Sequence, residues 1–176
     1  VAVNYNIVDS RITTVPEDVK ATTDTMAAAV TAEFPFSLSY QAHISDIGWQ
    51  ADRHDGELSG TEGKARRLEA IRIKRSDSLP IGDIVYRTHV QDYGWLNWVS
   101  NGESSGTEGK AKRLEAIEIK LTDDLAQQYD IYYRVHAQNV GWLDWAKNGE
   151  SSGTAGYGYR LEAIVIKLVE KNGEAP

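Results

Sequence analysis

One sequence pattern occurs three times in this chain, starting at Tyr40, Tyr86 and Tyr133. Each copy reads Tyr-x-x-His, then Gly-Trp, then a segment containing Ser-Gly-Thr-x-Gly, and ends in Arg-Leu-Glu-Ala-Ile-x-Ile-Lys. The tryptophan of the Gly-Trp pair recurs after 46 and then 47 residues. A unit of this length cannot bury its apolar face alone, so the three units are expected to pack together. A ligand site made by one unit would then be made three times, which favours multivalent binding over catalysis.

Within each copy the composition indicates short β-strands. The segments 85–90 and 131–136 are rich in β-branched and aromatic residues. The Gly-Trp pair then begins a second strand, which ends at an Asn-Gly turn at 101–102 and again at 148–149. The sequence therefore predicts at least two strands and a tight turn in each unit.

The last segment of each copy, represented by 114–121, could be a helix or a strand from its leucine and isoleucine spacing. Two isoleucines flank one variable slot, which holds Arg72, Glu118 and Val165 in the three copies. Such variation is expected of an outward strand position between two inward ones. The pattern therefore favours a strand.

Three such units can avoid exposed strand edges only by closing on one another. The sequence thus predicts an all-β domain closed with pseudo-threefold symmetry, either β-prism-like or a β-trefoil. Residues 1–37 are expected to be an N-terminal segment or linker, with a possible short helix over about 16–33. The rest, 38–176, is expected to be a single domain with repeats at approximately 38–83, 84–130 and 131–169.

Net charge and composition exclude several classes of binding partner. The formal net charge of −7 disfavours nucleic acid and anionic membranes, because phosphate contacts need clustered Lys and Arg. No apolar run approaches the roughly 20 residues that cross a bilayer, so membrane insertion is not expected. The chain has no cysteine, which excludes disulfides and thiolate chemistry. Five Trp and nine Tyr against two Phe suit half-exposed sites, because both side chains combine an apolar face with a polar edge.

The tryptophans are the main candidates for ligand contact. Trp49, Trp95 and Trp142 each follow a glycine, which can present a large ring at a bend. Such a ring could stack on a sugar, or it could pack as an anchor between units. Trp98 and Trp145 are the stronger candidates, because the first copy has an aspartate in that slot and a core position would not tolerate it. We expect both to be at least partly exposed.

Carboxylates and arginines also recur. Glu103 and Glu150 lie in the glycine-rich turn, and Arg113 and Arg160 each stand two residues before a glutamate. On a regular strand this Arg and Glu would share a face with the inward isoleucines, so they are expected to pair with each other or to form a polar pocket floor that binds ligand hydroxyls. Paired carboxylates could suggest glycoside hydrolysis, but triplication argues against an enzyme.

The Ser-Gly-Thr loops and the three repeated histidines could each have a structural role or could bind a ligand or metal. The loop glycines are expected to let a tight loop pass close to a neighbouring unit, while Thr107 and Thr154 cap the bend or contact a ligand. The loops lack the lysine and context of a phosphate-binding P-loop. His43, His89 and His136 could bind zinc or nickel around an axis, but hydrogen bonding within each unit is the commoner arrangement. No metal or cofactor is predicted.

These motifs together resemble the clostridial hydrophobic-W (ChW) repeat family over roughly residues 38 to 169. The resemblance implies an exported or surface protein of a Gram-positive bacterium that attaches non-catalytically to polysaccharide, cell wall or another surface ligand. The copies differ in two places. The first has Asp52 where the others have a second tryptophan, and the third has Tyr157 and Tyr159 in its loop, which could give the third site an extra aromatic wall.

The sequence therefore predicts a secreted or cell-surface module that binds carbohydrate or cell wall, with polysaccharide, glycan or peptidoglycan as partner. The alternative is an adhesion module that binds a host or surface protein. An enzyme is not expected. The candidate ligand-binding residues are Trp49, Trp95, Trp98, Trp142, Trp145, Glu103, Glu150, Arg113, Arg160, Thr107, Thr154 and Tyr157.

Overall fold

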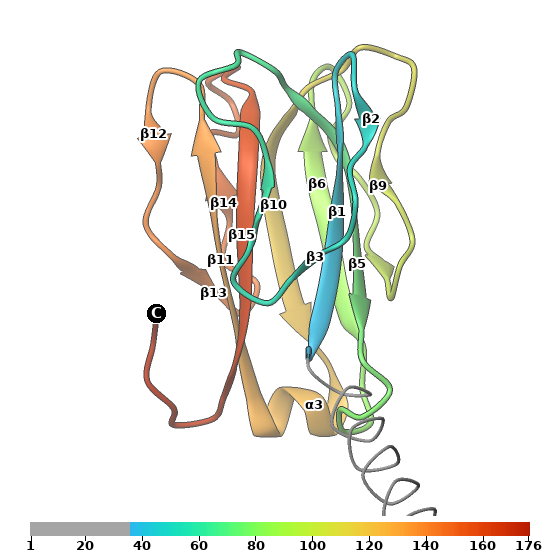
Figure 1. Ribbon diagram of the computed structural model, residues 1–176, viewed down its shortest axis with the longest axis vertical. Helices are drawn as coiled ribbons and strands as arrows, with labels where there is room; N and C mark the ends of the chain where they lie inside the picture. The colour runs from blue at the N-terminus through green and yellow to red at the C-terminus, as the bar shows by residue number, and fades with distance from the viewer. Residues whose placement is uncertain (1–35) are drawn as a thin grey trace, which may run out of the picture. The chain divides into compact units, whose positions relative to one another are not determined.

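A computed structural model describes residues 36–176, which form three β-sheets of five strands each (Figure 1). The helix expected over about 16–33, and almost all of the expected N-terminal segment 1–37, lie outside the described residues. Within 36–176 no helix has the length and hydrophobicity that a membrane-spanning helix requires.

Each repeat builds its sheet on two long antiparallel strands. Tyrosine, isoleucine and valine alternate with polar residues along these strands, and their buried side chains form one shared core. The segment 114–121 is a strand, as its pattern predicts, and the isoleucines on either side of the variable slot are buried. The long pairs are β1 (Leu38–Ile44) with β5 (Leu68–Arg75), β6 (Ile84–Val90) with β10 (Leu114–Leu121), and β11 (Tyr129–Ala137) with β15 (Leu161–Glu170).

The strand expected after each Gly-Trp turn is present but interrupted. In the second repeat, residues 96–98 separate two short pieces that both pair with β6. The pieces that contain the Gly-Trp pair are β2 (Gly48–Trp49), β7 (Gly94–Trp95) and β12 (Gly141–Trp142). The pieces that follow the interruption are β3 (Arg53–His54), β8 (Val99–Ser100) and β13 (Ala146–Lys147).

The fifth strand of each sheet comes from another repeat. β4 (Leu58–Gly60) of the first repeat pairs with β15 of the third. β9 (Ser105–Gly106) of the second repeat pairs with β5 of the first, and β14 (Ser152–Gly153) of the third pairs with β10 of the second. The exchange therefore runs round a closed ring, in the prism-like arrangement that the repeats predict, and each donated strand covers a sheet edge.

A glycine at the end of each donated strand makes this exchange possible. Gly60, Gly106 and Gly153 have φ of 117°, 128° and 138°. A Cβ at these positions would lie 2.4, 2.3 and 2.4 Å from a glutamate carbonyl oxygen of the neighbouring repeat. The backbones thus approach too closely for any side chain, which confirms the expectation that these loops pass close to a neighbouring unit.

A buried tyrosine fastens each exchanged loop. Tyr40, Tyr86 and Tyr133 are fully buried. The Tyr86 hydroxyl donates to the carbonyl of Glu103 in its own repeat and accepts from the N–H of Ile73 in the first repeat, 3.0 Å away. Burial raises the pKa of Tyr86 and Tyr133 to about 12 and also raises the pKa of Tyr40. The three hydroxyls are therefore neutral, and each donates to a carbonyl of its own repeat. Those of Tyr40 and Tyr86 also accept from a backbone N–H of another repeat and so join the two repeats.

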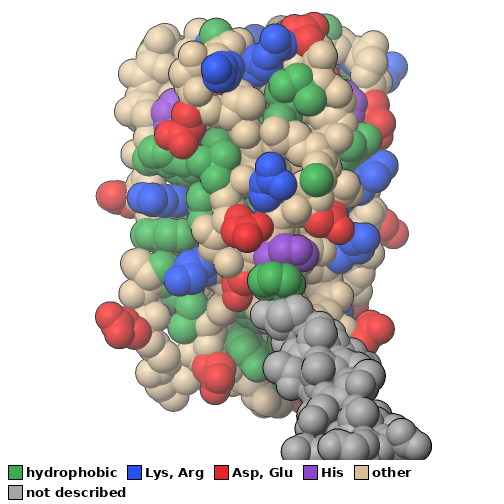
Figure 2. Space-filling view, in the orientation of Figure 1, with side chains coloured by type: hydrophobic (Ala, Val, Ile, Leu, Met, Phe, Trp, Pro, Cys, Tyr) green, Lys and Arg blue, Asp and Glu red, His purple; other side chains and the backbone are tan. Residues whose placement is uncertain are grey.

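The two ends of the prism differ. The Gly-Trp strands β2 and β12 lie near one end, and the short helix α3 (Asp123–Gln128) lies at the other, between β10 and β11 (Figure 1). Leu125 is the buried residue of α3 and packs into the core. Acidic and basic side chains are interspersed on the face that Figure 2 shows.

Candidate functional site

The Gly-Trp turn places one half-buried indole over each long hairpin. The turn begins with Asp46, Asp92 or Asn139 at φ of 66°, 69° and 67°, and the tryptophan then pairs opposite the histidine of the long strand. The imidazole and indole rings meet edge to face, with centroids 5.2, 5.4 and 5.4 Å apart. A Cβ at the glycine before each tryptophan would have open space, so the positive φ alone explains the glycine.

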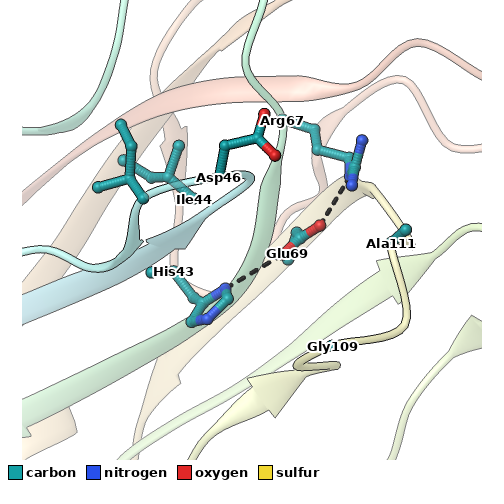
Figure 3. A pocket seen from close by; sticks show the side chains of 9 residues that line it. His43, Ile44, Asp46, Arg67, Glu69, Gly109 and Ala111 are labelled. Carbon is teal, nitrogen blue, oxygen red and sulfur yellow. Dashed lines mark hydrogen bonds and ion pairs between the residues drawn. The ribbon is translucent and has the colours of Figure 1, made fainter.

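A histidine, a glutamate and an arginine form a charged row beside each indole. His43 Nδ1 lies 3.2 Å from Glu69 Oε1, and Arg67 Nε donates to Glu69 Oε2 at 2.7 Å, as Figure 3 shows. The corresponding distances are 3.0 and 2.8 Å in both other repeats. We call each such row with its indole a tryptophan site. The first comprises His43, Trp49, Arg67 and Glu69, the second His89, Trp95, Arg113 and Glu115, and the third His136, Trp142, Arg160 and Glu162.

The expected Arg–Glu pair is present. However, it does not share the core-facing side of the strand with the isoleucines, as a regular strand would require. A β-bulge shifts the register between His43 and Ile44, so that Ile44 pairs with Leu68 and Glu69 is the extra residue. Leu68 therefore enters the core in place of the charged pair. Glu69 is 5% exposed and has an imidazole on one oxygen and a guanidinium on the other, which satisfies the buried carboxylate.

The histidines bind within their own repeats and do not converge on a metal site. Each imidazole faces the glutamate of its own repeat, and the hydrogen bond that the alternative predicts is present at His136. Among residues 36–176 no group of three or more potential ligands is placed to hold a metal ion.

Two glutamates from neighbouring loops complete two of the sites. Glu108 of the second repeat accepts from Trp49 Nε1 at 3.1 Å, and Glu62 of the first repeat accepts from Trp142 Nε1 at 3.0 Å. The third repeat has Ala155 at this position, and Trp95 Nε1 has no acceptor within the described part of the chain. The roles of these glutamates could not be predicted from the sequence, because they depend on strand exchange.

The loop that contains Tyr157 belongs to the second tryptophan site. We expected Tyr157 to add a wall to the third site, but β14 carries this loop onto β10 of the second repeat. A Cβ at Gly158 would lie 3.3 Å from Arg113 Nη2, which places the loop beside the second site. Tyr157 is 78% exposed and Tyr159 half-buried.

Cations cover part of the indole surfaces. The Arg87 guanidinium lies 4.9 Å from the Trp95 ring and 4.7 Å from Trp98, and Arg134 lies 5.1 and 5.0 Å from Trp142 and Trp145. The first repeat lacks the second tryptophan, and Arg72 lies 3.9 Å from Trp49. Trp98 is 36% exposed and Trp145 half-buried, which confirms that both are partly exposed.

Among the remaining candidate residues, Glu103, Glu150 and Thr154 cap turns or loops in this structure. Glu103 and Glu150 accept from the backbone N–H groups of Ser100 and Lys147, each at 3.1 Å. Thr154 is buried and its hydroxyl donates to the Tyr159 carbonyl at 3.0 Å. Thr107 has its N–H bound to the Glu69 carbonyl at 2.9 Å. The structure thus brings Arg113 and Arg160 to the tryptophan sites, but not Glu103 or Glu150.

Three apolar turn residues were missed. Ile47, Tyr93 and Val140 occupy equivalent positions before the Gly-Trp pairs and are 52%, 50% and 49% exposed. Ile47 lines a pocket of about 460 Å³ with His43, Arg67 and Glu69, and the next repeat contributes Gly109 and Ala111 (Figure 3). An apolar residue at the same place in all three turns was the available signal, since turns are usually polar.

The fold and these sites define a closed, three-repeat β-module with one half-exposed tryptophan site per repeat. A family profile described as "ChW: Clostridial hydrophobic W" matches residues 43–77, 89–123 and 136–170. The chain belongs to this family, whose repeats are found in bacterial, often extracellular, proteins. No match was found among curated proteins or among solved structures.

Proposed function

We propose that this chain is a non-catalytic carbohydrate-binding module of an exported or surface protein, and that it binds cell-wall or other polysaccharide through its tryptophan sites. The observation that carries the proposal is the pocket of about 460 Å³ at the boundary of two repeats, where Ile47, Arg67 and His43 are grouped. Pockets of this size accept small ligands or polymer segments.

The residues at this pocket suit a sugar. At this pocket the exposed Ile47 can pack on the C–H face of a pyranose. The indoles do not line this pocket and offer separate faces for stacking. Arg67 bonds Glu69 through its Nε, and no partner for its terminal nitrogens is found in the described range 36–176, so they can donate to hydroxyl oxygens. Trp98 supplies the most exposed of the five indoles, next to the second site.

Three similar sites favour a repetitive ligand. A shallow site of this kind is expected to bind a short saccharide with a dissociation constant of about a micromolar to a millimolar. On a polymer, two or three sites bound at once raise the effective concentration and hence the overall affinity. The unequal tryptophan sites predict that the three contributions differ.

The test compares retention on insoluble polysaccharide and purified peptidoglycan, together with a glycan array. The double variant Trp98→Ala with Trp145→Ala is expected to lose at least about tenfold in polymer retention, because each removed stacking surface contributes about 1 kcal/mol. Ile81→Ala, which truncates another exposed apolar side chain in the turn between β5 and β6, is the matched control and should bind like the wild type. Equal retention by all three proteins would contradict stacking, and hydrolysis of a polysaccharide would contradict a non-catalytic role.

The second candidate is a protein-binding adhesion module. The exposed apolar residues Ile47, Tyr93 and Val140 favour it, because exposed aromatic and aliphatic side chains are typical anchors of protein interfaces. This function predicts no retention on any glycan, saturable binding to a purified surface protein, and loss of that binding in the triple variant with serine at these positions.

A further inference from the structure

Three equivalent arginines line one pocket at the end of the prism. Arg67, Arg113 and Arg160 each precede a long return strand, and all three line a single pocket of about 390 Å³. The backbone carbonyls of these arginines accept from the turns that lead to the Gly-Trp pairs, at 3.0, 3.0 and 2.9 Å. Because the three arginines are related by the repeat, a pocket that they share lies on the pseudo-threefold axis at the Gly-Trp end.

The groups that this pocket offers to a ligand are hydrogen-bond donors from arginine and glutamine side chains. Each guanidinium bonds its glutamate through Nε, and no partner for the terminal nitrogens is found within residues 36–176. Gln91 and Gln138 also line the pocket. Their side-chain oxygens accept from the backbone N–H groups of Arg113 and Arg160, each at 3.4 Å, which leaves both amide NH₂ groups as further donors.

The acidic partners of these arginines do not line this pocket. Its lining consists of the three arginines, the two glutamines, Ala111 and Gly158. The glutamates direct one carboxylate oxygen to the arginine Nε and the other to the histidine. The arginine side chains remain 33%, 29% and 23% exposed, so a ligand can reach them. No acidic residue of the described range 36–176 lines the pocket, and three guanidinium groups there favour an anion.

We propose that this axial pocket binds one compact polyvalent anion with phosphate or carboxylate groups. The planar guanidinium presents paired N–H donors that match the oxygens of both groups, and several arginines can contact different oxygens at once. A volume of about 390 Å³ is within the range of small-molecule sites. The axial pocket differs from the proposed saccharide sites because it uses no indole and gathers all three arginines, although Arg67 borders both kinds of pocket.

Pyrophosphate and citrate are the probes, each titrated into the whole chain by isothermal titration calorimetry, with sodium chloride at equal ionic strength as the blank. The expected result is one anion bound per chain, together with a melting temperature that rises with the anion but not with chloride. Three anions per chain, or no saturable heat at millimolar concentration, would overturn the proposal.

Gln138→Glu is the decisive variant. The new carboxylate keeps an oxygen to accept from the Arg160 N–H, so the fold is preserved, but it adds a negative charge to the pocket lining. We expect at least a tenfold loss of anion affinity. Gln128→Glu, on an exposed position of α3, changes the net charge equally and should bind like the wild type. Equal affinity in the two variants would contradict the axial site.

A second variant guards against a local folding defect. Gln91→Glu makes the same change in the second repeat and should produce a similar loss, whereas polymer retention through the tryptophan sites should persist in both variants. A wild-type chain that binds the anion but is not retained on any polysaccharide would count against the saccharide proposal alone.

Discussion

The second tryptophan site differs from the first and third in one contact, although all three are built from the same residue types. Trp49 and Trp142 donate to Glu108 and Glu62 from a neighbouring loop, at 3.1 and 3.0 Å. Around Trp95 the neighbouring loop has Ala155 instead, and the exposed Tyr157 follows two residues later. Among residues 36–176, Trp95 Nε1 therefore lacks the acceptor that the other two indoles have.

This difference shows that each site is encoded by two repeats. The hairpin supplies the histidine, tryptophan, arginine and glutamate, and the donated strand supplies the loop that covers the indole edge. A substitution in the third repeat therefore changes the site of the second. Under the proposed saccharide function, we expect the second site to be the strongest, because a ligand there can use the indole N–H and a nearby tyrosine.

The largest loss of stability is expected from a substitution that pushes the loop of the third repeat away from the second tryptophan site. Gly153→Ala would place a Cβ 2.4 Å from the Glu115 carbonyl oxygen at φ of 138°. We expect the free energy of unfolding to fall by about 3 kcal/mol or more, because backbone must move. Gly156→Ala is the control, since its Cβ would meet open space at φ of 90°, and it should cost only about 1 kcal/mol. Urea denaturation measures the free energy of unfolding of both variants. Equal losses would show that Gly153 is needed for its positive φ and not for the close approach of the neighbouring backbone.

The next largest loss of stability is expected at Tyr86, which holds the loop that the second repeat donates to the first tryptophan site. Tyr86→Phe leaves the Ile73 N–H without its acceptor and the Glu103 carbonyl without its donor. We expect a loss of about 2 kcal/mol in the free energy of unfolding. Tyr93→Phe, which changes a half-exposed tyrosine in a turn, should be nearly neutral.

The same tyrosines predict loss of stability in alkali. Burial raises the pKa of Tyr86 and Tyr133 to about 12, above the ordinary value of about 10. The native state therefore holds the phenolic protons more tightly than the unfolded state does. Their contribution is complete below about pH 10 and is lost as the pH rises toward about 12. Circular dichroism between pH 8 and 12 should show this loss, and it should be shallower in Tyr86→Phe; an equally steep loss would contradict the assignment.

The sequence predicted the parts of the fold that depend on local pattern. Alternating side chains identified the long strands, and the glycine at 60, 106 and 153 indicated a close approach to a neighbouring unit. The direction of the strand exchange was not predictable, because the three Ser-Gly-Thr segments are nearly identical and could pair with any hairpin. Glu62 and Glu108 were missed for that reason. The bulge at Glu69 was missed because strict alternation was assumed, and its cause is the tertiary need to bury Leu68 and pair the carboxylate.

Making the three sites alike should have a smaller effect on stability and a clear spectroscopic one. Ala155→Glu restores the acceptor that Glu62 and Glu108 provide elsewhere. The Trp95 indole N–H resonance should then move toward those of Trp49 and Trp142 in a proton–nitrogen correlation spectrum, with about 0.5 kcal/mol of added stability. Glu62→Ala should shift the Trp142 resonance in the opposite sense. An unchanged Trp95 signal would show that the third loop does not follow the geometry of the other two.

The smallest effect is expected in the turns that lead into the indoles, where the repeats again differ. Lys112 donates to Asp92 at 2.6 Å, and Arg66 to Asp46 at 2.9 Å, whereas the third repeat has Asn139 and Tyr159 in these two places. The hydrogen bond and charge of Lys112 hold the pKa of Asp92 below its ordinary value. This contact therefore stabilises the fold above the unfolded-state pKa of Asp92, and its contribution is lost as the pH falls through the folded-state pKa.

The variant Lys112→Tyr tests this contact. A carbon-detected NMR titration should show the Asp92 pKa returning toward its ordinary value. Stability should change little, because the pair is exposed and screened by salt. The Trp95 indole resonance should move less than in Ala155→Glu, since Lys112 bonds Asp92 and not the indole N–H. A shift as large as that in Ala155→Glu would mean that the turn, and not the exchanged loop, distinguishes the second site.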